Sequence, residues 1–320
     1  MFDSCSHLKL LDLSNFRTSE VLDMGSMFRN CNSLTSLDLS MFDTRNVKDM
    51  FSMFEGDKEL VYLNLSSFIT TNVKDMFSMF SQCKLTSIDL KGFETPNVRD
   101  FSKMFENCSQ LEYLDLSNFK PIYAEDLSSM FKYCSNLTSI NFSGFNTEDV
   151  IDMSYMFSGC SSLDNLNLKD FDTRLVITME AMFEGCHQVT YFDLSSFKTP
   201  YLRNMRNMFI GNKIVTSIDL SNFVTNKVEN MEIIFEDCHS ITSIELGKNF
   251  DTSKVTNFAK MFKSCYSLET LDLSSFNTSN AKSLEGMFYN CSSLTNIDIY
   301  LNLIQAKLHL YHQCFILVKN

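Results

Sequence analysis

The chain has 320 residues and a formal net charge of −12, with 30 Phe, 19 Met and 11 Cys. Without clustered Lys or Arg, this charge argues against an extended nucleic-acid contact, which needs a basic footprint, and favours cationic partners or ions. No run of about 18 apolar residues is present to span a bilayer, and the amino terminus lacks the features of a secretory signal.

A Met-Phe pair recurs along the whole sequence in steps of 25 to 27 residues, with Ile-Phe at Ile234. The pairs begin at Met1, Met27, Met53, Met79, Met104, Met130, Met156, Met182, Met208, Met261 and Met287. Repeats of this length cannot bury their apolar faces alone and must stack on their neighbours. We therefore expect an α/β solenoid of about twelve 26-residue coils, forming one domain over residues 1–299.

Each copy contains a predicted strand with Leu-x-x-Leu-x-Leu spacing. In the copy from Cys31 to Glu55, Leu37 and Leu39 share one face of the strand, whereas Asp38 points to the other. Copies of this strand are expected to pair in parallel and to build a sheet on one face of the solenoid.

Two further columns follow the strand in chain order. The first column contains Thr18, Thr44 and their equivalents. Pro96 and Pro200 each directly follow one of these Thr residues, which predicts a tight turn with Pro at its second position. The column of Asp49 contains only Asp, Asn, Thr or Ser, so a short helix is expected to begin there and run to the Cys. A single longer helix that begins at the Thr is the alternative.

Ten cysteines form one column, which predicts buried, reduced thiols that pack as small apolar side chains. They are Cys5, Cys31, Cys83, Cys108, Cys134, Cys160, Cys186, Cys238, Cys265 and Cys291, while Asp57 and Asn212 fill two gaps. Bridges between coils would be strained because stacked Cβ directions are parallel, and a single column does not supply the tetrahedral ligands of zinc. No metal or cofactor is expected.

The pattern departs from its period at three places. One residue is missing beside Cys83, and one is added near Gly247. The chain begins within a repeat, as though further repeats preceded Met1, and residues 300–320 contain none of the columns. We expect that segment to be a degenerate cap or tail.

The combination L-x-x-L-D-L-S-x-F with M-F-x-x-C-x-x-L, as in Leu271 to Met287, resembles the BspA-like (Treponema-type) class of leucine-rich repeats. The resemblance covers about residues 1–299. It implies a curved solenoid with a parallel sheet on one face and short helices or turns on the other. It also implies an adhesion role at the cell surface, and it offers no catalytic residues.

A polar column on the exposed side of the strand is the predicted partner-binding surface. Its acidic members are Asp12, Asp38, Asp89, Asp115, Asp193, Asp219, Glu245, Asp272 and Asp298, and Tyr62, Tyr113 and Tyr191 lie two residues before column positions. Carboxylates on adjacent parallel strands repel each other unless hydrogen bonds, cations or a ligand offset the charge. The strip would attract a basic protein segment or bind divalent cations weakly. Alternatively, its Asp side chains bond the neighbouring Ser and Thr residues.

The sequence therefore predicts a non-enzymatic interaction module that binds a protein partner through its strand face at the cell surface. The alternative is an intracellular repeat scaffold, which the reduced thiols also fit. An enzyme is disfavoured because the prominent Asp, Ser and Cys residues all lie in repeat columns.

Overall fold

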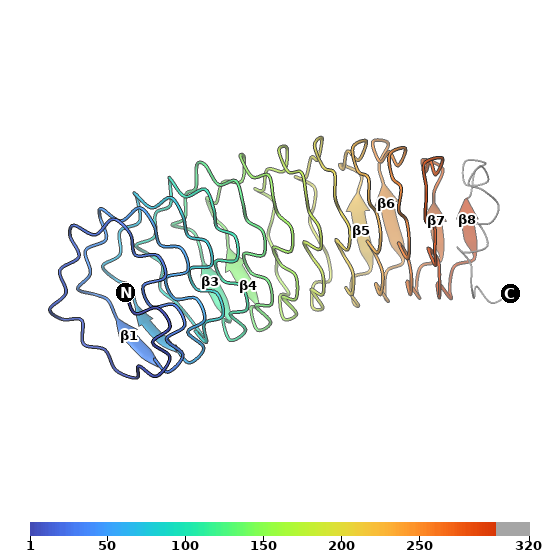
Figure 1. Ribbon diagram of the computed structural model, residues 1–320. Helices are drawn as coiled ribbons and strands as arrows, with labels where there is room; N and C mark the ends of the chain where they lie inside the picture. Colours follow the sequence, from blue (N-terminus) through green and yellow to red (C-terminus); the bar gives the residue numbers. More distant parts are fainter. Residues whose placement is uncertain (299–320) are drawn as a thin grey trace. The chain divides into compact units, whose positions relative to one another are not determined.

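The computed structural model describes residues 1–298, which form two compact units (Figure 1). The first unit contains residues 1–150 and 159–171, and the second contains residues 151–158 with the chain from residue 172 onward. In each unit the chain winds as coils whose equivalent residues lie side by side. The expectation for residues 300–320 falls outside the described residues.

Short strands lie at the predicted Leu-x-Leu positions in both units. The first unit holds β1 (Ser36–Asp38), β2 (Tyr62–Asn64), β3 (Tyr113–Asp115) and β4 (Ser139–Asn141). The second unit holds β5 (Ser217–Leu220), β6 (Ser243–Leu246), β7 (Thr270–Asp272) and β8 (Asn296–Asp298).

The strands pair in parallel with the repeat in register, as the sequence predicts. β1 pairs with β2, β3 with β4, β5 with β6 and β7 with β8, so that Leu37 lies beside Leu63 and Ile218 beside Ile244. The ladders are two-stranded, so the structure divides the expected sheet into four short pairs.

Stacked phenylalanines form the centre of both units. In the first unit the ring centroid of Phe54 lies 5.8 Å from that of Phe28 and 5.6 Å from that of Phe80, with nearly parallel planes. In the second unit Phe209 and Phe235 stack in the same way at 5.7 Å. These five rings are fully buried, because each coil covers one face of the ring in the next.

The predicted helix after the Asp column is wrong, since residues 1–298 contain no helix. The Asp49 carboxylate does accept the N–H of Phe51 at 3.1 Å, as a capping residue would. However, Ser52 and Gly56 have φ of 51° and 78°, and left-handed residues end a right-handed helix. Three overlapping turns replace it, closed by Met53 N–H to Met50 C=O, by Glu55 N–H to Ser52 C=O and by Asp57 N–H to Phe54 C=O.

Bonds between coils explain why turns are favoured over a helix here. The N–H groups of Ser52, Phe54 and Gly56 donate to carbonyls of the next coil at 2.7 to 2.9 Å. In a helix these donors would bond within their own segment. The stack thus pairs these backbone N–H groups with carbonyls of the neighbouring coil, and a helix, which would need the same N–H groups, does not form in this segment.

The Thr column forms the predicted tight turn and not the longer helix. Val47 N–H donates to Thr44 C=O at 3.0 Å, and Leu202 N–H donates to Thr199 C=O at 3.2 Å with Pro200 at the second turn position. Proline suits this position because its fixed φ matches the turn.

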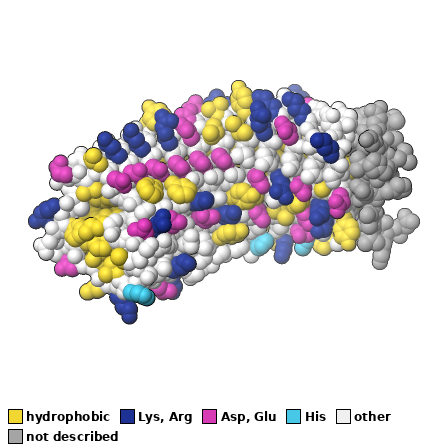
Figure 2. Space-filling model, in the orientation of Figure 1, with side chains coloured by type: hydrophobic (Ala, Val, Ile, Leu, Met, Phe, Trp, Pro, Cys, Tyr) yellow, Lys and Arg dark blue, Asp and Glu magenta, His cyan; other side chains and the backbone are white. Residues whose placement is uncertain are grey.

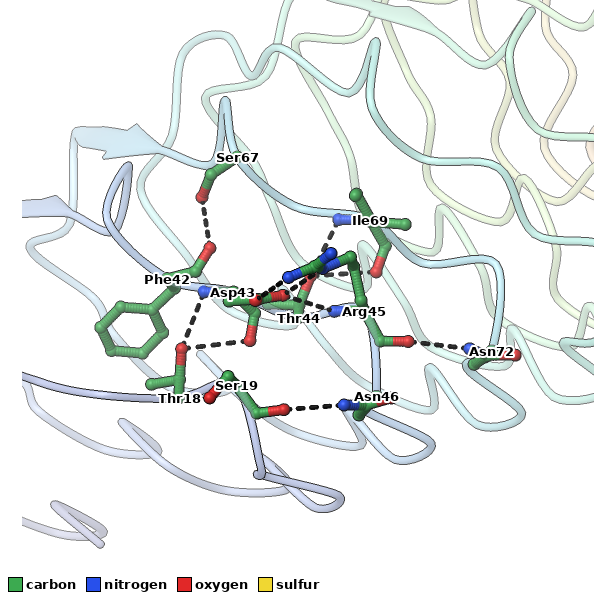
Figure 3. A network of polar contacts seen from close by, with 10 residues as sticks. All are labelled: Thr18, Ser19, Phe42, Asp43, Thr44, Arg45, Asn46, Ser67, Ile69 and Asn72. Atoms are coloured by element: carbon green, nitrogen blue, oxygen red, sulfur yellow. Dashed lines mark hydrogen bonds and ion pairs between the residues drawn. The ribbon is translucent and has the colours of Figure 1, made fainter.

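The Thr hydroxyl also joins one coil to the next (Figure 3). The Thr44 hydroxyl donates to the carbonyl of Ile69 at 2.9 Å and accepts the N–H of the same residue at 2.8 Å. Thr18 bonds the backbone of Asp43 in the same way. Each buried Thr of this kind therefore pairs two backbone groups that have no other partner in the turn.

The cysteines of the column are free thiols, as predicted, and all except Cys5 are buried. The Cys108 thiol donates to the carbonyl of Phe80 at 3.0 Å, and Cys238 donates to Phe209 at 3.1 Å. Burial raises the pKa of both thiols to about 12. They are consequently protonated at neutral pH and serve as small donors inside the stack.

Candidate protein-binding face

The exposed side of the strands carries the predicted polar column. In the first unit Leu37 and Leu114 are buried, whereas Asp38 and Asp115, which follow them, are exposed. Asp12 and Asp89 hold the equivalent exposed places in coils without an assigned strand. On the side of the molecule that Figure 2 shows, exposed acidic side chains lie in rows with basic and apolar side chains between them.

The Asp carboxylates of this column have a structural role at the strand ends. Asp12, Asp38, Asp89 and Asp115 each accept the N–H two residues onward, at distances of 2.9 to 3.1 Å. These bonds lower the pKa of Asp12, Asp38 and Asp115 below the ordinary value. These three carboxylates therefore stay ionised at neutral pH, and hydrogen bonds from the neighbouring residues offset part of the repulsion.

The second unit repeats this arrangement with its own members. Asp193, Asp219 and Asp272 accept the N–H of the Ser two residues onward at 2.8 to 3.1 Å. Glu245 is exposed in β6 beside Asp219 of β5, and Asp298 lies in β8 beside Asp272 of β7.

The three predicted tyrosines are half exposed. Tyr62 and Tyr113 in the first unit are 56% and 50% exposed, and Tyr191 in the second is 57% exposed. Tyrosine presents a large rigid surface and a hydroxyl, both of which suit a binding contact.

Three of the predicted residues come together around one hollow of the first unit. Asp89, Tyr113 and Asp115 line a hollow of about 360 Å³, together with Ser87 and Ile88. Tyr62 is not part of its lining, and Asp12 and Asp38 lie in other coils of the same face. The hollow thus has two carboxylates and one aromatic ring on its wall.

Lys91 and Asn118 are among the lining residues that the sequence analysis did not predict. Lys91 lines the hollow, and its ammonium lies 3.6 Å from the Asp89 carboxylate. Asn118 also lines it and donates its amide to the Lys91 carbonyl at 2.8 Å. The signal was present at Lys91, because a Lys there replaces the Ser found at the same place in most copies.

A second acidic row lies on a different side of the first unit. Asp23, Asp49, Asp75, Asp100 and Asp126 pair in parallel from coil to coil. Burial, followed by the charges of Asp100 and Asp49, raises the pKa of Asp75. In the second unit the equivalent places hold Asp152 and then the uncharged Thr178, Asn204, Asn230, Asn257 and Ser283.

We expect Asp75→Asn to stabilise the first unit by on the order of 1 kcal/mol at pH 7, because it removes repulsion between half-buried carboxylates. Asn keeps the acceptor for the N–H of Phe77, as Asn204 and Asn230 accept the equivalent N–H groups in the second unit. Urea unfolding followed by circular dichroism measures the gain. It should shrink as the pH falls through the raised pKa of Asp75, and a gain of equal size at pH 3 would contradict this explanation.

The strands, the buried Leu positions and the coil-to-coil turns define the chain as a leucine-rich repeat protein. A solved leucine-rich repeat protein from Bacteroides ovatus shares the fold at a TM-score of 0.57 and 19% identity, over 100% of this chain and 84% of that one. The sequence matches the family described as "Mycoplasma protein of unknown function, DUF285" over residues 1–119, 125–244 and 211–309. The chain belongs to that family.

Other solved leucine-rich repeat proteins are similar at a lower level. A leucine-rich cell surface protein from Faecalibacterium prausnitzii matches with 13% identity and a TM-score of 0.32, over 92% of this chain and 79% of that one. One from Eubacterium ventriosum matches with 15% identity and a TM-score of 0.35, over 92% and 90%. No curated protein sequence matches. The leucine-rich repeat class is confirmed, and the BspA-like type stays a prediction.

Within residues 1–298, no helix is long and apolar enough to cross a membrane.

Proposed function

We propose that the chain is a non-enzymatic interaction module that binds a protein partner through the strand face of its first unit. The observation that carries this proposal is the hollow lined by Asp89, Tyr113 and Asp115. The exposed carboxylates of Asp89 and Asp115 beside an exposed aromatic ring suit a Lys or Arg side chain of the partner. This cation would pair with Asp115 and compete with Lys91 for Asp89, while its stem packs on the ring.

The remaining polar residues support a binding role more than a catalytic one. The prominent Asp and Cys side chains hold backbone groups of the fold, as Asp38 does for Ser40 and Cys108 for Phe80. A catalytic centre would need reactive side chains outside these structural columns. The strand face of a repeat stack, in contrast, is an extended surface of the kind on which such proteins bind partners.

Exposure at the cell surface is the localisation that we propose together with this role. The resemblance to BspA-like repeats and the leucine-rich repeat fold support it. Antibody labelling of intact and permeabilised cells that express the full-length gene product tests it. Labelling of permeabilised cells alone would favour the intracellular scaffold, which the reduced thiols also fit.

Short fluorescent peptides of basic, neutral and acidic sequence test the binding site when titrated against the whole chain by fluorescence anisotropy. We expect the basic peptides to bind most tightly and to weaken about tenfold in the double variant Asp89→Asn, Asp115→Asn, because each lost charge pair contributes about 0.5 to 1 kcal/mol. Tyr113→Ser should weaken binding further, and raised salt should weaken binding to the unchanged chain.

Asp272→Asn is the matched control, because Asp272 accepts a backbone N–H at a strand end of the second unit as Asp115 does in the first. This variant should leave the affinity unchanged. Equal binding of basic and acidic peptides, or equal loss in the control, would contradict the proposed site.

A further inference from the structure

One column of the fold carries asparagines that join adjacent coils. Asn46 and Asn72 donate their side-chain amides to the carbonyls of Ser19 and Arg45, at 2.7 and 2.8 Å (Figure 3). Asn280 of the second unit donates to Ser253 at 2.7 Å in the same way. The position therefore has a structural task that an amide performs and an apolar side chain cannot.

The second unit lacks this asparagine in four consecutive coils, where Leu175, Tyr201, Lys227 and Lys254 occupy the position. The first two are apolar or aromatic, and they are 41% and 49% exposed. The adjoining column is apolar in neighbouring coils, where Ile151 and Ile177 are 43% and 41% exposed. The first unit has Lys48, Lys74, Arg99 and Glu125 in this column, with Leu22 as its one apolar member. Ile177 N–H donates to Ile151 C=O at 2.9 Å, so these two residues are neighbours across coils.

Ile151, Leu175, Ile177 and Tyr201 thus form an apolar patch in the part of the fold where the repeat otherwise favours hydrogen-bonding or charged residues. Exposed apolar side chains are ordinary when isolated, but contiguous ones mark interaction sites. Leu175 and Tyr201 also cannot form the side-chain hydrogen bond that asparagine forms at this position in other coils. Packing inside this unit does not require the change, because Asn280 shows that the asparagine is accommodated there.

Two cations continue the same columns beyond the patch. Arg203 follows Ile177, to whose carbonyl its N–H donates at 2.8 Å. Lys227 follows Tyr201, and its ammonium lies 4.0 Å from the centre of the tyrosine ring. Neither side chain forms an ion pair with another part of residues 1–298, although the chain is strongly acidic and Glu229 follows Arg203 in its column.

We infer that this patch is a second docking surface, whose occupant is a protein segment with exposed apolar side chains next to Asp or Glu. The apolar residues would be covered by the partner's apolar side chains, and the partner's carboxylates would meet Arg203 and Lys227. Its charge preference is opposite to that of the strand-face hollow, so the two surfaces select different partners.

Selection of random peptides displayed on phage against the whole chain tests this surface. The counter-selection uses the double variant Ile177→Lys, Tyr201→Asn, which restores residues that the repeat uses elsewhere. The amide introduced by Tyr201→Asn would supply a donor for the carbonyl of Arg174, 27 residues earlier, as Asn46 bonds Ser19. The variant is therefore expected to fold as well as the original, which a thermal melt verifies.

We expect enrichment of peptides that combine aliphatic or aromatic residues with Asp or Glu. A synthetic peptide of the enriched sequence should bind the double variant at least tenfold more weakly, and the variant Arg203→Gln, Lys227→Gln several-fold more weakly. Tyr123→Asn changes the same column in the first unit and should leave the affinity unchanged, as should the strand-face variants.

Failure of any peptide to discriminate the chain from the double variant would overturn the inference. Enrichment of basic or uncharged peptides would overturn the stated partner chemistry. Sedimentation velocity is run in parallel, and a dimer that the double variant abolishes would assign the patch to a second copy of the chain instead.

Discussion

Replacing Asp57 with Asn should stabilise the first unit above pH 4. The stabilisation relative to the original chain should grow as the pH rises to about 8. Asp57 fills a gap in the cysteine column and is fully buried. One carboxylate oxygen accepts the N–H of Cys31 at 2.7 Å, and the other has no hydrogen-bond partner within residues 1–298. Burial raises the pKa of this carboxyl from 3.8 to about 8.

The direction of the pH dependence follows from proton uptake. Between pH 4 and 8 the folded chain keeps the Asp57 proton, whereas the unfolded chain releases it, so unfolding becomes more favourable as the pH rises. The pKa difference corresponds to a loss on the order of 5 kcal/mol across this range. Urea unfolding followed by circular dichroism should show the loss in the original chain and not in Asp57→Asn. Parallel pH profiles for the two proteins would contradict the assignment.

The chain supplies the reverse experiment as a control. Asn212 fills the equivalent gap in the second unit, where its amide donates to the carbonyls of Phe183 and Phe209, both at 2.8 Å. Asn212→Asp should therefore destabilise that unit and give it the pH dependence that Asp57→Asn removes from the first. A pH-independent effect would show that lost packing, and not charge, is responsible.

Thr44→Val should destabilise the first unit by about 2 to 4 kcal/mol, although the two side chains are nearly equal in volume. The fully buried hydroxyl pairs both the N–H and the C=O of Ile69, at 2.8 and 2.9 Å. Valine would leave both backbone groups without that partner. An unpaired buried group costs about 1 to 3 kcal/mol, and the partial burial of these bonds keeps the expected loss in the lower part of the summed range. Chemical unfolding of the variant and the original chain measures the difference.

Thr95→Val is the matched control within the same unit. Thr95 is equally buried, but its hydroxyl has no hydrogen-bond partner in the part of the chain that the structure describes. The next coil has Pro121 where other coils have Thr, and a proline restricts the backbone of the residue before it, which would otherwise meet the hydroxyl. Valine should be neutral or stabilising here. Equal losses at Thr44 and Thr95 would show that the hydroxyl bonds between coils contribute little.

Both predictions concern the bonds that hold one coil on the next, and these bonds also position the strand face. Asp89 and Asp115 face the same hollow because their coils are kept in register. A variant that loosens this register should therefore weaken peptide binding as well as stability. Thr95→Val removes no hydrogen bond between coils, so it should leave both the register and the peptide binding unchanged.

The sequence by itself determined the repeat length, the strands and their buried faces. Leu37 and Phe54 are buried, Asp38 is exposed and the cysteines are free thiols, as the pattern predicted. These features follow from alternation along a strand and from columns of identical residues, which a single sequence displays directly. The Asp49 carboxylate also accepts the N–H two residues onward, as the sequence predicted for a capping residue, although no helix follows within residues 1–298.

Only the tertiary structure decided whether a helix or turns form after the Asp column. It also decided which of the acidic residues lie around one hollow. Ser52 and its equivalents, which include Tyr155 and Ile233, adopt left-handed backbone that their side chains disfavour. They do so because N–H groups in this segment bond carbonyls about 26 residues away, an interaction that local sequence does not reveal. The hollow beside Tyr113 likewise depends on residues from adjacent coils, so its lining became known only once the coils were stacked.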